Sequence, residues 1–227
     1  MSESGEFEID WQREQRAAVA EAVFCDNKSV VQIAAILQAS GERPLLLTRL
    51  SHDKLAALSG ELRAALDHDP SSLTAFYRHA PGPLTSGPVV VCAGTSDLPV
   101  AREAQRTLAF HGYAAPLIAD VGVAGLWRLM KRIDEIRSFS LVIAVAGMEG
   151  ALFSVLGGLV AAPVIAVPTS IGYGVAAHGR AALSGALASC AQGLVAVNID
   201  NGFGAACAAL RILRAAPSRG HDLHRKE

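Results

Sequence analysis

The sequence predicts an α/β protein in which a doubly wound parallel sheet is flanked by helices and preceded by a small N-terminal α+β domain. In the larger part of the chain, short apolar runs alternate with helical stretches. These runs are continuously apolar, which is typical of parallel strands that helices cover on both faces. Between Leu141 and Leu210 only Glu149, Arg180 and Asp200 are charged, so this stretch must be largely enclosed.

A segment rich in proline and glycine divides the chain. Residues 81–88 hold three prolines and two glycines, which predicts a linker. It separates an N-terminal domain at residues 1–80 from a larger domain at residues 89–215, and we expect residues 216–227 to form a flexible tail. The smaller domain has helical spacing at residues 10–24 and 29–38, a short strand at 44–48 and a charged amphipathic helix at 51–66.

The larger domain alternates strands and helices in a regular way. We predict strands at residues 89–93, 115–118, 141–146, 164–167 and 194–199. Helices are expected at residues 100–111, 124–136, 151–161, 180–189 and 204–215. This order predicts the parallel sheet named above.

The composition argues against several classes of protein. A formal net charge of −1 gives no long-range attraction to nucleic acid. Residues 150–179 carry no charge, but Gly157, Gly158, Pro163 and Pro168 interrupt any helix long enough to span a membrane. The first ten residues are polar and acidic, so we expect no signal peptide.

The cysteines indicate a reducing compartment. Cys25, Cys92, Cys190 and Cys207 show no C-x-x-C spacing, and we expect reduced thiols in a cytoplasmic protein. Three of them, Cys25, Cys92 and Cys207, lie within apolar elements and are expected in the core.

Polar residues and glycines gather after the predicted strands. Ligands of such sheets bind beyond the carboxyl ends of the strands. The candidate residues at these positions are Gly94, Thr95, Ser96, Asp97, Gly147, Met148, Glu149, Thr169, Ser170, Asn198, Asp200 and Asn201.

Three side chains are the chemical candidates, and each has a structural alternative. Asp97 is either a base or the cap of the following helix. Glu149 is either a general base whose pKa burial raises or an acid favoured by a helix dipole. Cys190 is either a nucleophile or an inert buried thiol.

The sequence blocks at residues 94–101, 120–125, 146–152, 164–174, 189–190 and 197–205 resemble the carboxylase/hydrolase that makes the nickel-pincer nucleotide precursor, the LarB family. Its catalytic domain is similar to aminoimidazole ribonucleotide carboxylases of the PurE type, a flavodoxin-like three-layer sandwich. The resemblance is dense over residues 88–212 and looser over residues 10–37 and 47–49. Its blocks follow one another in the family's order.

The resemblance implies a reaction. The pyridinium ring of nicotinic acid adenine dinucleotide is carboxylated with CO2, and the phosphoanhydride is then hydrolysed, giving pyridinium-3,5-biscarboxylic acid mononucleotide and AMP. Cys190 matches the family's covalent nucleophile and Glu149 its glutamate, the candidate base, while Ser96 and Asp97 match residues near the reacting carboxylates. We expect Asp97, Glu149 and Cys190 to lie on adjacent loops at strand ends.

The resemblance also implies the surroundings of this reaction. We expect Mg²⁺ to assist the hydrolysis, with no tightly bound organic cofactor and no nickel. A homo-oligomer, an octamer by the same resemblance, would cover part of the apolar stretch.

Two alternatives remain open. One is a PurE-type mutase acting on aminoimidazole ribonucleotide, although that family uses a histidine where Glu149 stands and no histidine occurs between His111 and His178. The other is a non-catalytic nucleotide-binding or assembly protein that keeps only the fold.

Overall fold

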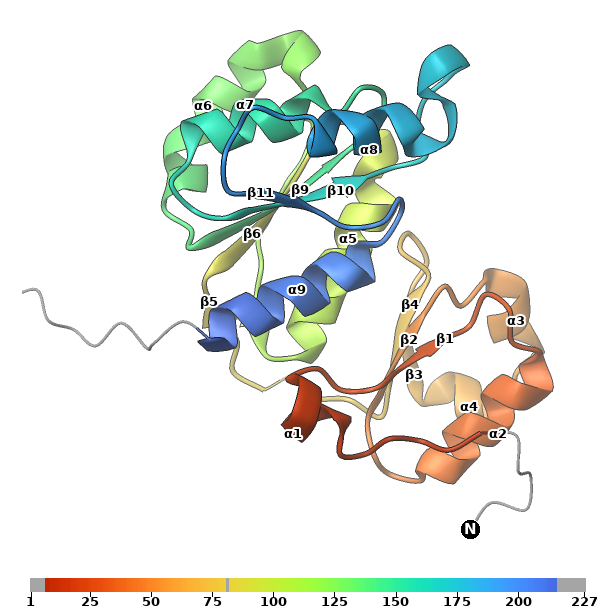
Figure 1. Cartoon of the computed structure of the whole chain (residues 1–227). Coiled ribbons are helices and arrows are strands. Elements are labelled where there is room, and N and C mark those ends of the chain that lie inside the picture. Colours follow the sequence, from red (N-terminus) through yellow and green to blue (C-terminus); the bar gives the residue numbers. More distant parts are fainter. Residues whose placement is uncertain (1–6, 81, 216–227) are drawn as a thin grey trace, which may run out of the picture.

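The computed structural model describes residues 7–80 and 82–215. Within these residues the chain forms two α/β units, each built around its own sheet (Figure 1). The predicted flexible tail at residues 216–227 lies outside the described residues, as do residues 1–6 and residue 81.

The N-terminal unit is a mixed four-stranded sheet with short helices. The strand order is β1-β2-β4-β3, in which β1 and β2 are parallel and the other pairs antiparallel. Ile33, Leu37, Leu47 and Tyr77 are buried in its core. The elements are α1 (Arg13–Ala17), β1 (Ala22–Phe24), α2 (Val30–Ser40), β2 (Leu45–Thr48), α3 (His52–Ala57), α4 (Gly60–Ala64), β3 (Leu66–Asp69) and β4 (Thr74–Tyr77).

Two helices predicted in this unit are wrong in extent. The predicted helix at residues 10–24 holds only α1 and then strand β1, because Val23 pairs with Leu47 of β2 and an isolated short helix gains little stability. The predicted helix at residues 51–66 splits in two. Ser59 begins the second helix, since its Oγ accepts the N–H of Leu62 at 3.3 Å.

The larger unit is the predicted α/β fold. Its five-stranded sheet has the order β11-β10-β9-β6-β8, and all of its pairings are parallel. The strands are β6 (Pro88–Cys92), β8 (Leu117–Ile118), β9 (Leu141–Ala146), β10 (Val164–Pro168) and β11 (Leu194–Ala196). The helices are α5 (Leu98–Phe110), α6 (Leu126–Arg137), α7 (Ala151–Leu159), α8 (Arg180–Leu187) and α9 (Gly202–Ala215), with 3-10 turns η1 (Thr95–Asp97), η2 (Val123–Gly125) and η3 (Gly174–Gly179).

Smaller differences from the prediction lie at the edges of the sheet. Strand β11 ends at Ala196, three residues before the predicted end, because its pairing with β10 stops there. Part of the predicted linker is a strand: β5 (Thr85–Ser86) pairs with β7 (Tyr113–Ala114), and Thr85 N–H donates to the carbonyl of Gly112 at 2.8 Å.

Helices form a layer on each face of this sheet (Figure 1). Leu108 of α5 and Leu210 of α9 are buried against one face. Leu129 of α6 and Leu156 of α7 are buried against the other, together with Ala182 of α8. The continuously apolar strands predicted from the sequence are therefore covered on both sides.

The uncharged run at residues 150–179 folds into α7, β10 and the turn η3. No helix within the described part of the chain has the length and apolar character needed to cross a bilayer.

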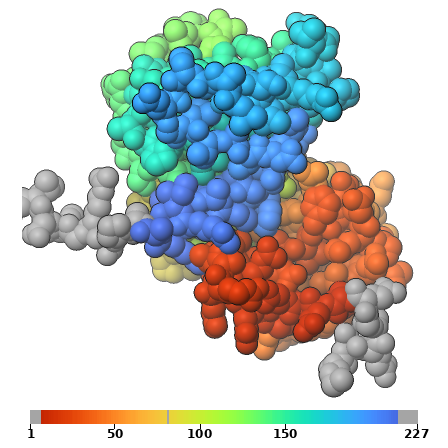
Figure 2. All heavy atoms as spheres, in the orientation of Figure 1, coloured from red at the N-terminus to blue at the C-terminus, as the bar shows by residue number. Residues whose placement is uncertain are grey.

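Charged side chains join the two units. Arg102 of α5 donates two hydrogen bonds to the buried carboxylate of Asp69, at 2.7 and 3.1 Å. The C-terminal helix lies against the N-terminal segment, as Figure 2 shows, with Arg214 donating to the carbonyl of Ala18 at 2.7 Å. Burial by itself would raise the pKa of Asp69, but the hydrogen bonds from Arg102 and Ser72 hold it well below the usual value.

Candidate functional site

A cleft opens at the carboxyl edge of the five-stranded sheet, between the loops that follow β6 and β9. These strands are neighbours, yet the chain leaves β6 toward β8 and leaves β9 toward β10 on the other side. Loops that diverge in this way leave the crevice in which doubly wound folds bind ligands. The cleft has a volume of about 380 Å³, and its lining includes Gly94, Ser96, Asp97, Gly147, Met148 and Glu149.

Asp97 is the buried carboxylate of this cleft. Its Oδ1 accepts the hydroxyl of Thr169 at 2.7 Å, and its Oδ2 accepts the N–H of Gly94 at 2.9 Å. Burial raises the pKa of Asp97, and these hydrogen bonds offset the effect only in part. Asp97 stands at the N-cap position of α5, but its side chain accepts no N–H of that helix, so the cap alternative is wrong for its carboxylate. The carboxylate instead closes turn η1 through Gly94 and lines the cleft.

Backbone strain marks the loop after β9. A Cβ on Gly147 would stand 2.2 Å from the carbonyl oxygen of Ile171, so only glycine fits there. Met148 follows in the left-handed region at φ 53°, and such conformations persist where the surrounding structure holds them. Glu149, at the tip of this loop, is exposed in the single chain, which differs from the desolvated environment expected from the sequence.

The remaining strand-end residues form a second group beside the cleft. Ser170 N–H donates to Oδ1 of Asp200 at 2.8 Å, which ties the loop after β10 to the loop after β11. Asn201 accepts the N–H of Gly204 at 2.8 Å near the start of α9. Asn198 and Thr95 are exposed and do not line the cleft.

Two charged residues of the cleft are absent from the candidates predicted from the sequence. Asp120 and Arg128 both line it, and Arg128 Nη1 donates to Asp120 Oδ2 at 2.8 Å. The Arg128 side chain is 35% exposed, so its terminal nitrogens can bind an anion in the cleft, whereas its buried Nε has no partner among the described residues. Asp120 follows a predicted strand, so the expectation that ligands bind beyond strand ends could have identified it. Arg128 has the sequence pattern of an ordinary surface arginine on an amphipathic helix.

Cys190 does not lie on a strand-end loop with Asp97 and Glu149, and that expectation is wrong within one chain. It follows the C-terminus of α8 and precedes β11, so it stands toward the amino side of the sheet. Its neighbours pack along α7, where Ser189 and Ser154 share a hydrogen bond of 2.7 Å. The Cys190 thiol is exposed and lies outside the lining of the cleft.

The other thiols are structural. Cys25 and Cys92 are buried, and Cys207 is half-buried. Burial raises the pKa of Cys25 to about 12 and that of Cys92 and Cys207 to about 11. At neutral pH these groups are protonated and do not act as nucleophiles.

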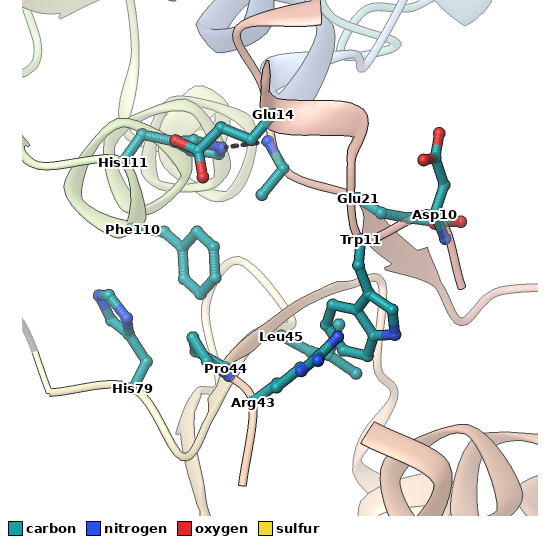
Figure 3. Close-up of a pocket in the computed structure, with 11 residues that line it drawn as sticks. Asp10, Trp11, Glu14, Glu21, Arg43, Pro44, Leu45, His79, Phe110 and His111 are labelled. Carbon is teal, nitrogen blue, oxygen red and sulfur yellow. Dashed lines mark hydrogen bonds between the residues drawn. The ribbon is translucent and has the colours of Figure 1, made fainter. Parts of the chain in front are cut away.

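A second hollow of about 430 Å³ lies between the two units (Figure 3). Trp11, Arg43, His79 and Phe110 are among its walls, and Arg43 stacks over the Trp11 ring at 4.7 Å. It adjoins the C-terminal end of α5, whereas Asp97 precedes the N-terminal end of that helix. Because none of the predicted site residues lines it, the cleft at the strand ends is the candidate site.

A resident metal centre needs several ligating side chains close together. Within residues 7–80 and 82–215, no three His, Cys, Asp or Glu side chains gather closely enough to hold a metal ion. The cleft therefore does not fit a metal held by protein ligands alone. Its charged groups are the buried carboxylate of Asp97, the exposed carboxylate of Glu149 and the ion pair of Arg128 with Asp120.

The fold is a doubly wound α/β sheet with a charged cleft at its switch point, which is the place where ligands of such sheets bind. Residues 89–224 match the AIR carboxylase family, and residues 1–78 match the LarB/PurE-like N-terminal domain. The chain belongs to the AIR carboxylase family and is LarB/PurE-like, which confirms the resemblance drawn from the sequence.

A relative is found in Methanocaldococcus jannaschii, where an uncharacterized protein is 49% identical over 119 residues. The match covers 51% of this chain and 45% of that protein. The matched region thus spans less than half the length of the relative.

Proposed function

We propose that this protein is a carboxylase that adds CO2 to the pyridinium ring of nicotinic acid adenine dinucleotide and then hydrolyses its phosphoanhydride. The products are pyridinium-3,5-biscarboxylic acid mononucleotide and AMP. The observation that carries the proposal is the cleft between β6 and β9, which the buried Asp97 and the partly exposed Arg128 line. The chain matches the LarB/PurE-like N-terminal domain and the AIR carboxylase family, which supports the proposal.

The chemistry requires a nucleophile, because a pyridinium carbon is electron-poor and cannot attack CO2. A thiolate adds to the ring carbon next to C5, and the ring nitrogen takes up an electron pair. C5 then attacks CO2, a base removes the C5 proton, and the C–S bond breaks to restore the aromatic ring and the thiolate. Water finally cleaves the phosphoanhydride and releases AMP.

Of the three carboxylates that line the cleft, Asp120 is paired with Arg128, which leaves two for the proton transfer. Glu149 is the candidate base taken from the resemblance, and it has access to a substrate from the open side of the cleft. Asp97 is buried, and its raised pKa suits a group that takes up a proton. Arg128 supplies the positive charge that a nicotinate carboxylate or a phosphate requires.

The position of Cys190 favours a site shared between copies of the chain. Since this thiol lies away from Asp97 within one chain, we propose that a homo-oligomer, with an octamer as the expected form, brings Cys190 of one copy to the cleft of another. Large apolar side chains are exposed at turn η3 and at the end of α8. Tyr173, Val175 and Leu187 are 77%, 99% and 71% exposed, and a neighbouring copy would cover them.

The test is an incubation of the full chain with nicotinic acid adenine dinucleotide, bicarbonate and Mg²⁺, the ion being carried by the substrate's phosphates. We expect AMP and a mononucleotide whose mass exceeds that of nicotinic acid mononucleotide by one CO2. Intact mass of the protein should reveal a pyridinium adduct on Cys190 that is absent in Cys190→Ala. If neither product forms, the proposed activity is wrong.

A second candidate is a PurE-type carboxylase acting on aminoimidazole ribonucleotide, favoured by the AIR carboxylase match at residues 89–224. The same incubation with that ribonucleotide separates the two. Carboxylation of the imidazole ring would favour this candidate. Binding of either nucleotide without turnover would instead favour a non-catalytic nucleotide-binding protein.

A further inference from the structure

An arginine of the N-terminal unit reaches the ligand edge of the larger sheet. Arg49 follows β2, and its Nη2 donates to the carbonyl oxygen of Asp200 at 2.8 Å. Both residues adopt left-handed backbone conformations, at φ 55° and 54°. Two such residues in contact indicate a junction that the tertiary structure holds in place, and strain of this kind concentrates at binding sites.

The guanidinium of Arg49 has fixed contacts but does not use all of its N–H donors. It lies 5.2 Å from the centre of the Phe24 ring and 4.0 Å from the carboxylate of Asp26. Its described hydrogen bond is the one to Asp200, whereas a guanidinium carries five N–H donors. The side chain is 36% exposed, so the remaining donors are accessible to a ligand.

The Asp200 loop connects Arg49 to the cleft. Asp200 N–H donates to the carbonyl of Pro168 at 2.9 Å, and Asp200 Oδ1 accepts from Ser170. Glu103 of α5 is buried beneath this loop and accepts the N–H of Phe203 at 3.1 Å, which fixes the start of α9. The Arg49 donors are thereby held at a defined position on the carboxyl edge.

Spacing along the edge suits a long anionic substrate. The cleft lies between β6 and β9, and β11 is two strands beyond β9, a separation of roughly 10 Å at the usual strand spacing. A mononucleotide half that occupies the cleft leaves the rest of a dinucleotide to extend along this edge. Arg128 lies near β8, on the side of the cleft opposite β11. It therefore does not contact the part of a substrate that extends toward β11.

We propose that Arg49 is an anion subsite for the phosphoanhydride of the substrate, so that the N-terminal unit completes the substrate site of the larger unit. This inference rests on the proposed function for the identity of the dinucleotide. The guanidinium binds a phosphate oxygen on the adenylate side while keeping its hydrogen bond to Asp200. Cleavage of the anhydride then separates the two phosphates and weakens the hold on AMP.

The test measures binding to the full-length protein by calorimetry, with nicotinic acid adenine dinucleotide, nicotinic acid mononucleotide and inorganic pyrophosphate as probes. Arg49→Met should raise the Kd of the dinucleotide roughly ten- to hundredfold. The mononucleotide should lose much less affinity, and Arg49→Lys should recover part of the loss. The matched control is Arg63→Met, because Arg63 is an exposed arginine of the same unit that also donates to a backbone carbonyl, that of Ala56.

Comparing the dinucleotide with the mononucleotide distinguishes direct binding of phosphate by Arg49 from a purely structural role of this residue. A merely structural clamp on the Asp200 loop would weaken the mononucleotide and the dinucleotide equally, and that result overturns the subsite. Unchanged dinucleotide binding in Arg49→Met, or absence of dinucleotide binding by the unmodified protein, also overturns it. If Arg49-dependent binding of the dinucleotide and of pyrophosphate is found without any carboxylation, the proposed function fails while the subsite stands.

Discussion

Thr169 donates a 2.7 Å hydrogen bond to Asp97, and this bond joins the ends of β10 and β6 across the intervening end of β9. The bond passes close to Gly147, where an added Cβ would stand 2.7 Å from the Thr169 hydroxyl. Three strand ends are thus tied together at one point of the cleft. The absence of a side chain at Gly147 makes that arrangement possible.

Gly147→Ala should destabilise the fold, because the new methyl meets the backbone of Ile171 as well as Thr169. We expect a loss of about 1–3 kcal/mol in the free energy of unfolding, measured with urea. The matched control is Gly158→Ala, where a Cβ meets nothing within 4 Å in helix α7. That change should stabilise by about 0.5–1 kcal/mol. Equal effects of the two variants would contradict the argument.

Thr169→Val should raise the pKa of Asp97, because it removes a hydrogen bond that favours the carboxylate. An NMR titration of the Asp97 side-chain carbon measures this without any assumption about activity. If Asp97 accepts a proton during turnover, the acidic limb of the rate profile should move to higher pH. Thr169→Ser, which keeps the hydroxyl, should leave the midpoint near that of the unmodified protein; a midpoint shifted as far as in Thr169→Val would disagree with this account.

Arg102→Met should loosen the contact between the two units. Removing this partner leaves the buried carboxylate of Asp69 without its cation, at an expected cost of about 1–2 kcal/mol because Arg102 itself is partly exposed. Since the pKa of Asp69 is lowered in the fold, its contribution is present above the unfolded value of about 3.9 and is lost as the pH falls through the folded pKa. The difference between variant and unmodified protein should therefore shrink below about pH 4.

The control for this prediction is Arg132→Met, which breaks an exposed pair with Glu135 in α6. Its effect should stay within about 0.5 kcal/mol. Urea denaturation at neutral and acidic pH provides both measurements. A cost for Arg102→Met that does not change with pH would show that the lost interaction is not the one with Asp69.

His111 should make stability depend on pH below about 6.5, the ordinary pKa of an imidazole. Its Nε2 accepts the N–H of Ala20 at 3.1 Å, which leaves the proton on Nδ1, 2.8 Å from the carbonyl of Thr107. Burial lowers the pKa of His111, so the folded chain binds the second proton more weakly than the unfolded chain. Stability is then full above about pH 6.5 and falls as the pH falls toward the folded pKa.

The measurement is the slope of unfolding free energy against pH. His111→Gln should flatten this slope, although His79, whose pKa is also lowered by burial, retains part of it. His52→Gln is the control, because His52 is exposed on α3. The same slope in His111→Gln as in the unmodified protein would be inconsistent with a buried neutral imidazole.

Mixing of variants tests whether two copies share a site. Cys190→Ala and Asp97→Asn should each abolish carboxylation under the proposed mechanism. Mixed oligomers of the two should regain roughly a quarter of the activity, because some sites then combine an intact cleft with an intact thiol from a neighbouring copy. Mass spectrometry confirms that the oligomers are mixed, and no recovery in verified mixtures would show that Cys190 acts within its own chain or not at all.

The strands of the larger sheet could be predicted closely, because a buried strand needs continuous apolar residues. Strand β9 has the predicted bounds, residues 141–146. The N-terminal unit could not be predicted as well, since the three residues of β1 (Ala22–Phe24) are too few for a strand pattern, and their pairing with β2 makes them a strand. Six candidate residues after β6 and β9 line the cleft, because strand ends can be located from the apolar runs.

Other parts of the site depend on contacts distant in sequence. Arg128 carries no local signal, although its partner Asp120 lies only eight positions earlier. Arg49 falls in a stretch that resembles the family, but its contact with Asp200 spans 151 positions. The separation of Cys190 from Asp97 follows from the direction of α8, which carries the chain back across the sheet before β11. Linear order could not show which residues share one edge.

The sequence by itself determined the α/β class, the core strands and the family. Strands that are buried on both faces need continuous apolar residues, and turns need particular residue types, so both features are visible in the sequence. Tertiary structure alone decided that Thr169 reaches Asp97, that Arg49 reaches Asp200 and that Cys190 stands apart from both. The physical reason is that hydrogen bonds act over about 3 Å, whereas the residues that make them here are 72 and 151 positions apart in the chain.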